Sequence, residues 1–168
     1  MLLPHIFFKE LDMLTWQDLI NQVVDLGFEE DTITSEEEYG RLIRNSINRA
    51  LGIIRTTVVM QIEGYLENIE QWGYSTTTEV TDEDGDTEEV TEWNYPKMRN
   101  ITISTDLTSK VQIPEVLEPL LPLLSAHYVW LDDDLTKATI YWNEYDDLKT
   151  QIINNCNRPR KVKIVGGF

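Results

Sequence analysis

The segment from Val111 to Asn155 constrains the fold of this chain more than any other part of its sequence. It contains an apolar run, a short acidic turn and a second amphipathic run, which is the pattern of two consecutive helices joined by a tight connection. Because proline is tolerated in a first helical turn, Pro119 and Pro122 predict a helix that begins near Pro119 and ends at Leu131. Its apolar residues leave little room for a solvated side: Leu120, Leu121, Leu123, Leu124, Tyr128 and Leu131. We therefore expect this helix at the centre of the core.

The second helix of this segment has its own start signal in the acidic turn. Asp133 or Asp134 can accept hydrogen bonds from the free N–H groups of a helix start and place negative charge at the positive end of the helix dipole. Apolar residues then recur at steps of three and four and predict a stripe that faces the first helix: Leu135, Ala138, Tyr141, Trp142, Tyr145, Leu148 and Ile152. Three consecutive aspartates also suggest a metal site, but adjacent side chains on a turn point in different directions. Capping is therefore the favoured interpretation of Asp132, Asp133 and Asp134.

Two more helices are predicted earlier in the chain. The first begins after Thr15, a good N-cap residue, with Asp18 at the acidic position of a capping box, and it ends at Gly27. The second begins at Ser35 and continues for about five turns, because apolar residues recur with helical spacing as far as Ile54. Four arginines lie between these apolar positions, and we interpret them as a solvated surface rather than a nucleic-acid site: Arg41, Arg44, Arg49 and Arg55. Residues 56–72 combine a β-branched run with a helix-compatible run and stay unassigned.

Residues 74–95 predict a β-hairpin. Two threonine-rich runs, YSTTTEVT and TEEVTEWNY, flank DEDGD, in which Asp84 and Gly85 are the residue types that a hairpin turn requires. Eight carboxylates crowd this segment and predict a ribbon that projects into water: Glu79, Asp82, Glu83, Asp84, Asp86, Glu88, Glu89 and Glu92. Facing like charges cost up to roughly 1 kcal/mol per pair, so we expect the hairpin to lean on a neighbouring surface or to be mobile in a lone subunit. Arg99–Ser104 and Lys110–Ile113 are predicted as short strands.

The net charge and the motifs limit the classes of function. The net charge of −16 argues against a protein that holds DNA by its phosphates, since such binding needs a basic surface, although DNA can pass an acidic protein without sticking. His5 lies in an N-terminal arm, His127 lies on the core helix, and the single cysteine, Cys156, is interpreted as a small apolar residue near a helix end. The sequence contains no metal-ligand spacing, nucleophile motif or phosphate-binding loop. We therefore predict a non-enzyme that requires no cofactor and no metal.

The 168 residues are interpreted as a single domain. Residues 1–14 form the N-terminal arm, residues 15–157 form a helical core with the β-hairpin at about 75–94, and residues 158–168 form a basic tail. The predicted fold class is mainly α, an antiparallel helix bundle with a projecting β-hairpin and an extended C-terminal tail. Charged residues interrupt the apolar N-terminus well before the length that spans a bilayer, so we expect a protein of the cytoplasm with no membrane partner.

In their order along the chain, these features resemble the head-tail connector (adaptor) proteins of tailed bacteriophages. The resemblance rests on LTWQDLINQVVDLGFEED, the helix containing RNSINRALGII, the β excursion, the two-helix segment and the terminal IVGGF. Its most specific parts are YVWLDDDLTKATIYWNEY and the closing GGF. It covers nearly the whole chain as a pattern of order and spacing. The DEDGD hairpin and the arm before Thr15 look like additions to the shortest pattern of the family, so no family role is carried over to them.

The resemblance implies a mostly helical virion protein, assembled in the host cytoplasm and located at the head-tail interface. Its subunits form a homo-oligomeric ring, commonly twelve-fold, beneath the portal of a DNA-filled head, and this ring joins the head to the tail. The implied partners are the portal protein, other tail or neck proteins, further copies of the chain, and double-stranded DNA that passes without specific binding. A stopper or tail-completion protein is the first alternative. An acidic helical module that binds a protein without forming a ring is the second, and an enzyme of unrecognised type is the third.

Two surfaces are candidates for these contacts. The tail is predicted to dock on the portal through a strand, basic side chains and a terminal aromatic residue: Arg158, Arg160, Lys161, Val162, Lys163, Ile164, Val165, Gly166, Gly167 and Phe168. The tip of the acidic hairpin, Glu83, Asp84 and Asp86, is predicted to face the DNA channel or the next ring of the tail. The competing interpretation of the tail is a frayed basic terminus, and that of the hairpin is a solvated loop.

Overall fold

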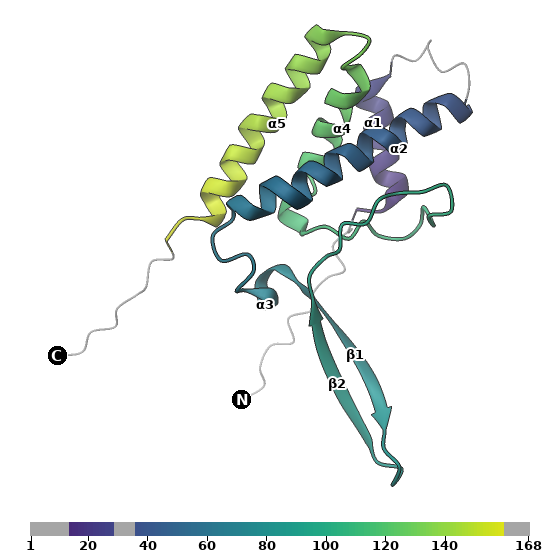
Figure 1. The fold of residues 1–168 in the computed structure, drawn as a ribbon, viewed down its shortest axis with the longest axis vertical. Coiled ribbons are helices and arrows are strands. Elements are labelled where there is room, and N and C mark those ends of the chain that lie inside the picture. The colour runs from purple at the N-terminus through teal and green to yellow at the C-terminus, as the bar shows by residue number, and fades with distance from the viewer. Residues whose placement is uncertain (1–13, 29–35, 160–168) are drawn as a thin grey trace, which may run out of the picture.

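A computed structural model describes residues 14–28 and 36–159 of the chain. Within these ranges most residues lie in helices, and the strands form one two-stranded antiparallel sheet. Helices make up a body from which the two strands project as a narrow ribbon (Figure 1). The predicted class, mainly α with a β-hairpin, is therefore confirmed at this level. Among the described helices, none is both long enough and apolar enough to cross a bilayer.

Helix α4 (Leu120–Trp130) lies at the centre of the body, as the sequence predicts. It packs against α1, α2 and α5, and Figure 1 shows it between α5 and α1 with α2 crossing in front. Eight of its eleven residues are buried: Leu120, Leu121, Pro122, Leu124, Ser125, Ala126, Val129 and Trp130. Pro119 is the N-cap residue and Pro122 lies in the first turn, where the missing N–H removes no intrahelical bond. Each fully buried leucine contributes about 1.5–3 kcal/mol, so Leu120, Leu121 and Leu124 make α4 a large source of apolar stabilisation.

Helix α5 (Leu135–Cys156) follows α4 after a short turn. Asp134 caps it, because its Oδ1 accepts hydrogen bonds from the N–H groups of Thr136 and Lys137 at 2.9 and 3.0 Å. Capping is therefore the role that the structure gives to Asp134. The buried residues of α5 are Ala138, Tyr145 and Ile152, which recur at steps of seven.

The wide apolar stripe predicted for α5 is wrong in part. Leu135, which was expected to face α4, is 69% exposed, and Trp142 is 39% exposed although its ring contacts His127 on α4. Helix α5 lies at the edge of the body and packs mainly against α4. A helix with one neighbour fully buries only a narrow seam, here Ala138, Tyr145 and Ile152. Leu135 therefore stays in solvent, while Leu148 beside the seam is half-buried.

Helix α1 (Trp16–Gly27) begins with the predicted capping box. The hydroxyl of Thr15 accepts from the N–H of Asp18 at 3.1 Å, and Asp18 Oδ2 accepts from the N–H of Thr15 at 3.2 Å. The hydroxyl of Thr15 also donates to Asp18 Oδ2 at 2.6 Å, and this bond, together with the bond from the Thr15 N–H, lowers the pKa of the Asp18 carboxyl below its ordinary value. The N–H groups of Thr15 and Asp18 thus find their partners within three residues of the sequence, which is why this helix start is predictable.

Helix α2 (Glu36–Ile53) continues beyond its predicted end into residues that the sequence left unassigned. A π-helical turn, Ile54–Val58, and a 3-10 turn, Val59–Gln61, extend it. The hydroxyl of Thr56 donates to the carbonyl of Gly52 at 2.7 Å, a side-chain bond that competes with the regular helix ladder. The widened turn keeps the apolar side inward, since Ile54, Val58 and Val59 are all buried.

The end of α5 is tied to the segment that follows these turns. Asn157 Nδ2 donates to the carbonyl of Gln61, and Asn157 Oδ1 accepts from the N–H of Glu63, both at 2.8 Å. The chain then enters α3 (Ile69–Trp72), a single helical turn that leads directly into the ribbon. One asparagine therefore fixes the base of the ribbon to the helical body.

The segment between the ribbon and α4 contains no strand, so the predictions for Arg99–Ser104 and Lys110–Ile113 are wrong. The backbone groups of Ile101 bond to the side chain of Asn48 on α2. The N–H of Val111 donates to the backbone just before α1 at 2.9 Å. These partners lie on helices or beside them, so the β-branched residues form loops and turns rather than a ladder. A short 3-10 turn, Glu115–Leu117, then leads into α4.

Candidate protein interaction surfaces

The acidic hairpin forms as predicted. Strand β1 (Tyr74–Thr81) pairs antiparallel with β2 (Thr87–Asn94), and the register places Glu79 directly opposite Glu89. Two threonine pairs on the same face of the ribbon join the strands through their hydroxyls: Thr77 with Thr91 at 3.2 Å, and Thr81 with Thr87 at 3.3 Å. Such cross-strand threonine pairs stabilise a solvated ribbon, which explains the threonine-rich composition.

The turn of the hairpin depends on a residue that the sequence analysis counted only as a charge. Asp82 Oδ1 accepts from the N–H groups of Asp84 and Asp86 at 3.0 and 2.9 Å. Gly85 has a φ of 87°, a left-handed conformation that glycine adopts without strain. The sequence does contain an indication of this role, because an aspartate at the start of a turn commonly accepts a hydrogen bond from the N–H two residues later, here that of Asp84. The predicted tip residues Glu83, Asp84 and Asp86 are all exposed.

The two strands project with little support from their own chain. All residues from 74 to 93 are exposed, and α3 is the main element that the strands contact besides each other. Only the base is anchored: the hydroxyl of Tyr95 donates to the carbonyl of Tyr65 at 2.8 Å, and the Tyr65 ring lies 5.8 Å from that of Trp72. Burial raises the pKa of Tyr65 above its ordinary value. An isolated two-stranded ribbon is only marginally stable in water, so contact with a further surface would stabilise its arms.

Little of the predicted docking tail falls within the described residues. Arg158 follows α5 and is exposed. The remaining tail residues lie outside the described ranges: Arg160, Lys161, Val162, Lys163, Ile164, Val165, Gly166, Gly167 and Phe168. Of the two candidate surfaces the structure thus describes Arg158 and the tip of the hairpin, and portal docking by residues 158–168 stays a prediction.

His127 is a half-buried histidine on α4, and one of its ring nitrogens is hydrogen-bonded. Its Nδ1 lies 2.8 Å from the carbonyl oxygen of Ala138, so this nitrogen carries the proton and donates. The imidazole also packs against the rings of Tyr128 and Trp142, at centroid distances of 4.9 and 5.1 Å. These contacts join α4 to α5 and give the histidine a structural role.

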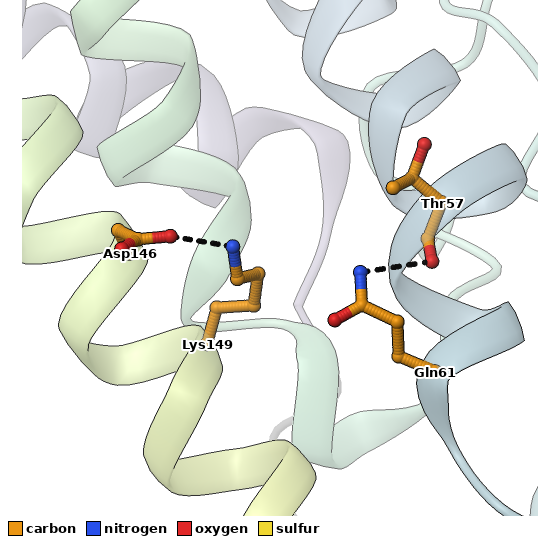
Figure 2. A network of polar contacts seen from close by, with 4 residues as sticks. All are labelled: Thr57, Gln61, Asp146 and Lys149. Atoms are coloured by element: carbon orange, nitrogen blue, oxygen red, sulfur yellow. Dashed lines mark hydrogen bonds and ion pairs between the residues drawn. The ribbon is translucent and has the colours of Figure 1, made fainter.

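The polar residues at the edge of the α4–α5 seam are held in local contacts. Lys149 pairs with Asp146 one turn away on α5 (Figure 2). The Lys149 amine also lies 5.4 Å from the centre of the Tyr145 ring. Burial of the phenol, together with nearby Tyr128 and Asp146, raises the pKa of Tyr145 to about 12. The phenol is therefore neutral at physiological pH. On the neighbouring segment, Gln61 donates to the carbonyl of Thr57 at 3.3 Å (Figure 2).

The described surface offers shallow grooves rather than a deep cavity. One groove of about 490 Å³ runs along α1 and is lined by Leu14, Asp18, Asn21, Gln22 and Asp25. A second, of about 200 Å³, lies between α1, α2 and the segment after the ribbon; Ile20, Arg44, Ile101 and Ile103 are among its lining residues. Within the described ranges, no three histidine, cysteine or acidic residues are arranged to hold a metal ion. Cys156 is half-buried, and this burial raises the pKa of its thiol.

Comparisons with protein-family models, with curated proteins and with solved structures find no match to this chain. The functional argument therefore rests on the residues and contacts described above.

Proposed function

We propose that this chain is a structural virion protein, the subunit of an adaptor ring that joins the portal of a DNA-filled phage head to the tail. In this proposal its helices form an antiparallel bundle, copies associate in a ring that is commonly twelve-fold, and DNA passes through the ring. One observation carries the proposal: an acidic ribbon projects from a helical body and has little support within its own chain. Such an element is expected in a subunit that is completed by its neighbours.

The charge of the ribbon suits a protein that DNA must pass without binding. Glu83, Asp84 and Asp86 form an exposed anionic tip. Carboxylates around a channel repel phosphates, whereas basic side chains release counterions and hold the duplex. We assign the tip to the DNA channel or to the next ring of the tail. Reversal of these three charges would slow DNA ejection in the first case and block tail addition in the second.

We assign the attachment to the portal to the basic C-terminal tail of this chain, residues 158–168. The eleven residues from Arg158 to Phe168 reach about 36 Å when extended, enough to cross onto a neighbouring chain. Val162 and Ile164 can add as a strand to a sheet edge, while the basic residues meet carboxylates. Individual contacts of this kind are weak, but a ring presents many copies at once, and linked sites gain roughly a hundredfold or more in affinity.

The proposal is tested by electron microscopy of the full chain mixed with the portal protein of the same phage. The expected result is a ring on the portal, while the free chain sediments as a monomer or a weak oligomer. A chain that ignores the portal would overturn the adaptor function and favour the acidic protein-binding module. A chain that binds only after another neck protein would favour the stopper.

Deletion of Lys161–Phe168 should leave the thermal midpoint unchanged and abolish attachment to the portal. Heads that still bind the truncated chain would place docking elsewhere.

A further inference from the structure

Charges are segregated along this chain. Residues 74–95 contain eight carboxylates and no lysine or arginine. Residues 39–62 contain four arginines and no acidic residue, and residues 93–105 contain Lys97 and Arg99 and no acidic residue. In a chain with a net charge of −16, two basic stretches without a single carboxylate are suited to an anionic partner.

Folding brings the two basic stretches together on one side of α2. Arg55 Nη1 donates to the carbonyl of Met98 at 3.0 Å. Met98 lies between Lys97 and Arg99 in the sequence, so this bond brings the second basic stretch to Arg55. Farther along α2, Asn48 bonds to Ile101. Arg44 lines the same groove as Ile101 and Ile103, so the segment after the ribbon follows α2 over several turns. We define the basic strip as Arg41, Arg44, Arg55, Lys97 and Arg99.

The helical spacing supports this strip. Arg41, Arg44 and Arg55 are separated by three and eleven residues, which places them on one side of a helix. Arg49 falls outside the strip, since its guanidinium lies 4.2 Å from the centre of the Tyr128 ring on α4. Within the described residues no carboxylate forms an ion pair with the strip. Arg41 and Arg99 are exposed, and no hydrogen bond engages their side chains there.

The ribbon of the same subunit does not cover this strip. It leaves the body beside α3 and extends away from the helices (Figure 1). Its register sets Glu79 against Glu89, a facing like-charge pair that destabilises an isolated ribbon. Trp93 lies on the same face of the ribbon and is 42% exposed. This face therefore offers carboxylates and an aromatic ring, both of which are favourable partners for guanidinium groups.

The lengths of the two elements match. From Arg41 to Arg55 the strip extends about 21 Å at the rise of a helix. Each strand of eight residues extends about 26 Å at the rise of an antiparallel strand. A ribbon laid along the strip would cover it with both strands, and its tip would extend past the helix. The tip residues would then stay free for the channel or tail contact proposed above.

We propose that the hairpin of one copy lies across the basic strip of the next copy, with the Glu79–Glu89 face toward the arginines. The inference deepens the proposed ring by naming the contact between its subunits. The surface that donates the ribbon differs from the surface that accepts it, so the contact is head-to-tail and closes into a ring when the rotation allows. Each exposed ion pair is weak, so the contact depends on several pairs together and weakens as salt rises.

A charge-reversal cycle tests the contact. The ribbon variant carries Glu79→Lys and Glu89→Lys, the strip variant carries Arg41→Glu and Arg99→Glu, and a third chain carries all four changes. Self-association of each full chain is measured by sedimentation at high concentration and low ionic strength. Each single set should weaken association about tenfold or more, and the third chain should recover to within about threefold of the natural chain. An equimolar mixture of the ribbon and strip variants should recover as well, because the contact is between copies.

The control variant carries Glu67→Lys and Glu70→Lys, which change the net charge equally on exposed residues outside both surfaces. It should associate within about twofold of the natural chain. All altered side chains are exposed, and circular dichroism with a thermal midpoint checks that each variant folds. Single sets that associate normally, or a four-change chain that does not recover, would overturn the contact. Rings that still form on the portal in that case would leave the adaptor function intact, whereas a natural chain that never binds portal would overturn the function alone.

Discussion

Asn48 on α2 makes two hydrogen bonds to the backbone of Ile101, 53 residues away in sequence. Its Oδ1 accepts from the Ile101 N–H at 2.8 Å, and its Nδ2 donates to the Ile101 carbonyl at 2.9 Å. One amide side chain therefore takes the place of a neighbouring strand for this residue. The pair also fixes the segment after the ribbon to α2, and so it holds Lys97 and Arg99 beside the arginines of the helix.

Replacement of Asn48 tests this relationship. Ile101 is 2% exposed, so Asn48→Ala leaves a buried N–H and a buried carbonyl without their partner. We expect the free energy of unfolding, measured with denaturant, to fall by about 1–3 kcal/mol. Asn45→Ala removes the same atoms from an exposed position on α2 and should change it by less than about 0.5 kcal/mol. Equal losses in the two variants would show that the Asn48 bonds contribute nothing specific.

A pair of leucine substitutions tests the limits of the core. Leu124 on α4 is fully buried, and Leu124→Ala should lower the free energy of unfolding by about 2–5 kcal/mol. Leu135 on α5 has the same side chain but is 69% exposed. Leu135→Ala should therefore change the stability by less than about 0.5 kcal/mol in the same denaturant experiment. A large loss of stability in Leu135→Ala would show that Leu135 belongs to the core, as its spacing in the sequence suggests.

The parts of the fold that the sequence predicts are those fixed by neighbouring residues. The Thr15 and Asp18 capping box, the Asp134 cap and the hairpin turn at Gly85 each involve groups a few residues apart. The central position of α4 is also predictable, because apolar residues on all sides of a helix require neighbours on all sides.

The parts that the sequence does not predict are decided by distant partners. The β-branched residues around Ile101 meet the strand pattern, but Asn48 supplies their hydrogen bonds. Leu135 has the spacing of a core residue, yet α5 packs mainly against α4 and leaves this leucine 69% exposed. The basic strip likewise depends on two stretches that are far apart in sequence and meet only in the fold. Of the predicted docking residues, the structure describes Arg158 and the hairpin tip, so the rest of the tail depends on experiment.

Glu118 gives a pH dependence with a defined sign. Burial raises the pKa of its carboxyl above the ordinary value of 4.5, with Glu115 adding to the rise and the N–H of Leu14 and nearby Lys110 opposing it. Oε1 is buried without a hydrogen-bond partner in the described part of the chain. Because the folded state binds this proton more tightly than the unfolded state, the ionised group lowers stability above its folded pKa. This cost disappears as the pH falls toward 4.5.

We therefore expect Glu118→Gln to raise the free energy of unfolding at neutral pH, since glutamine is neutral and still accepts a bond from Leu14. The advantage over the natural chain should shrink as the pH falls toward 4.5. Denaturant unfolding at several pH values measures both effects. Glu144→Gln, at an exposed position on α5, is the control and should change the stability by less than about 0.5 kcal/mol throughout. An advantage that grows on acidification would contradict the sign.

The last prediction separates the ribbon from the helical body. Gly85 has a φ of 87° and open space where a Cβ would lie, so Gly85→Ala introduces backbone strain without a clash. A left-handed alanine costs roughly 1–2 kcal/mol, a large share of the stability of a two-stranded ribbon. Hydrogen exchange of the amides in β1 and β2 should therefore accelerate. The thermal midpoint of the body should stay unchanged, because the strands pack mainly on each other and on α3.

Gly85→Asn is the matched control, since asparagine tolerates this conformation and should retain most of the protection from hydrogen exchange. A fall of several degrees in the midpoint with Gly85→Ala would show that the ribbon and the body unfold as one unit, and the ribbon would then be a less plausible element for exchange between copies.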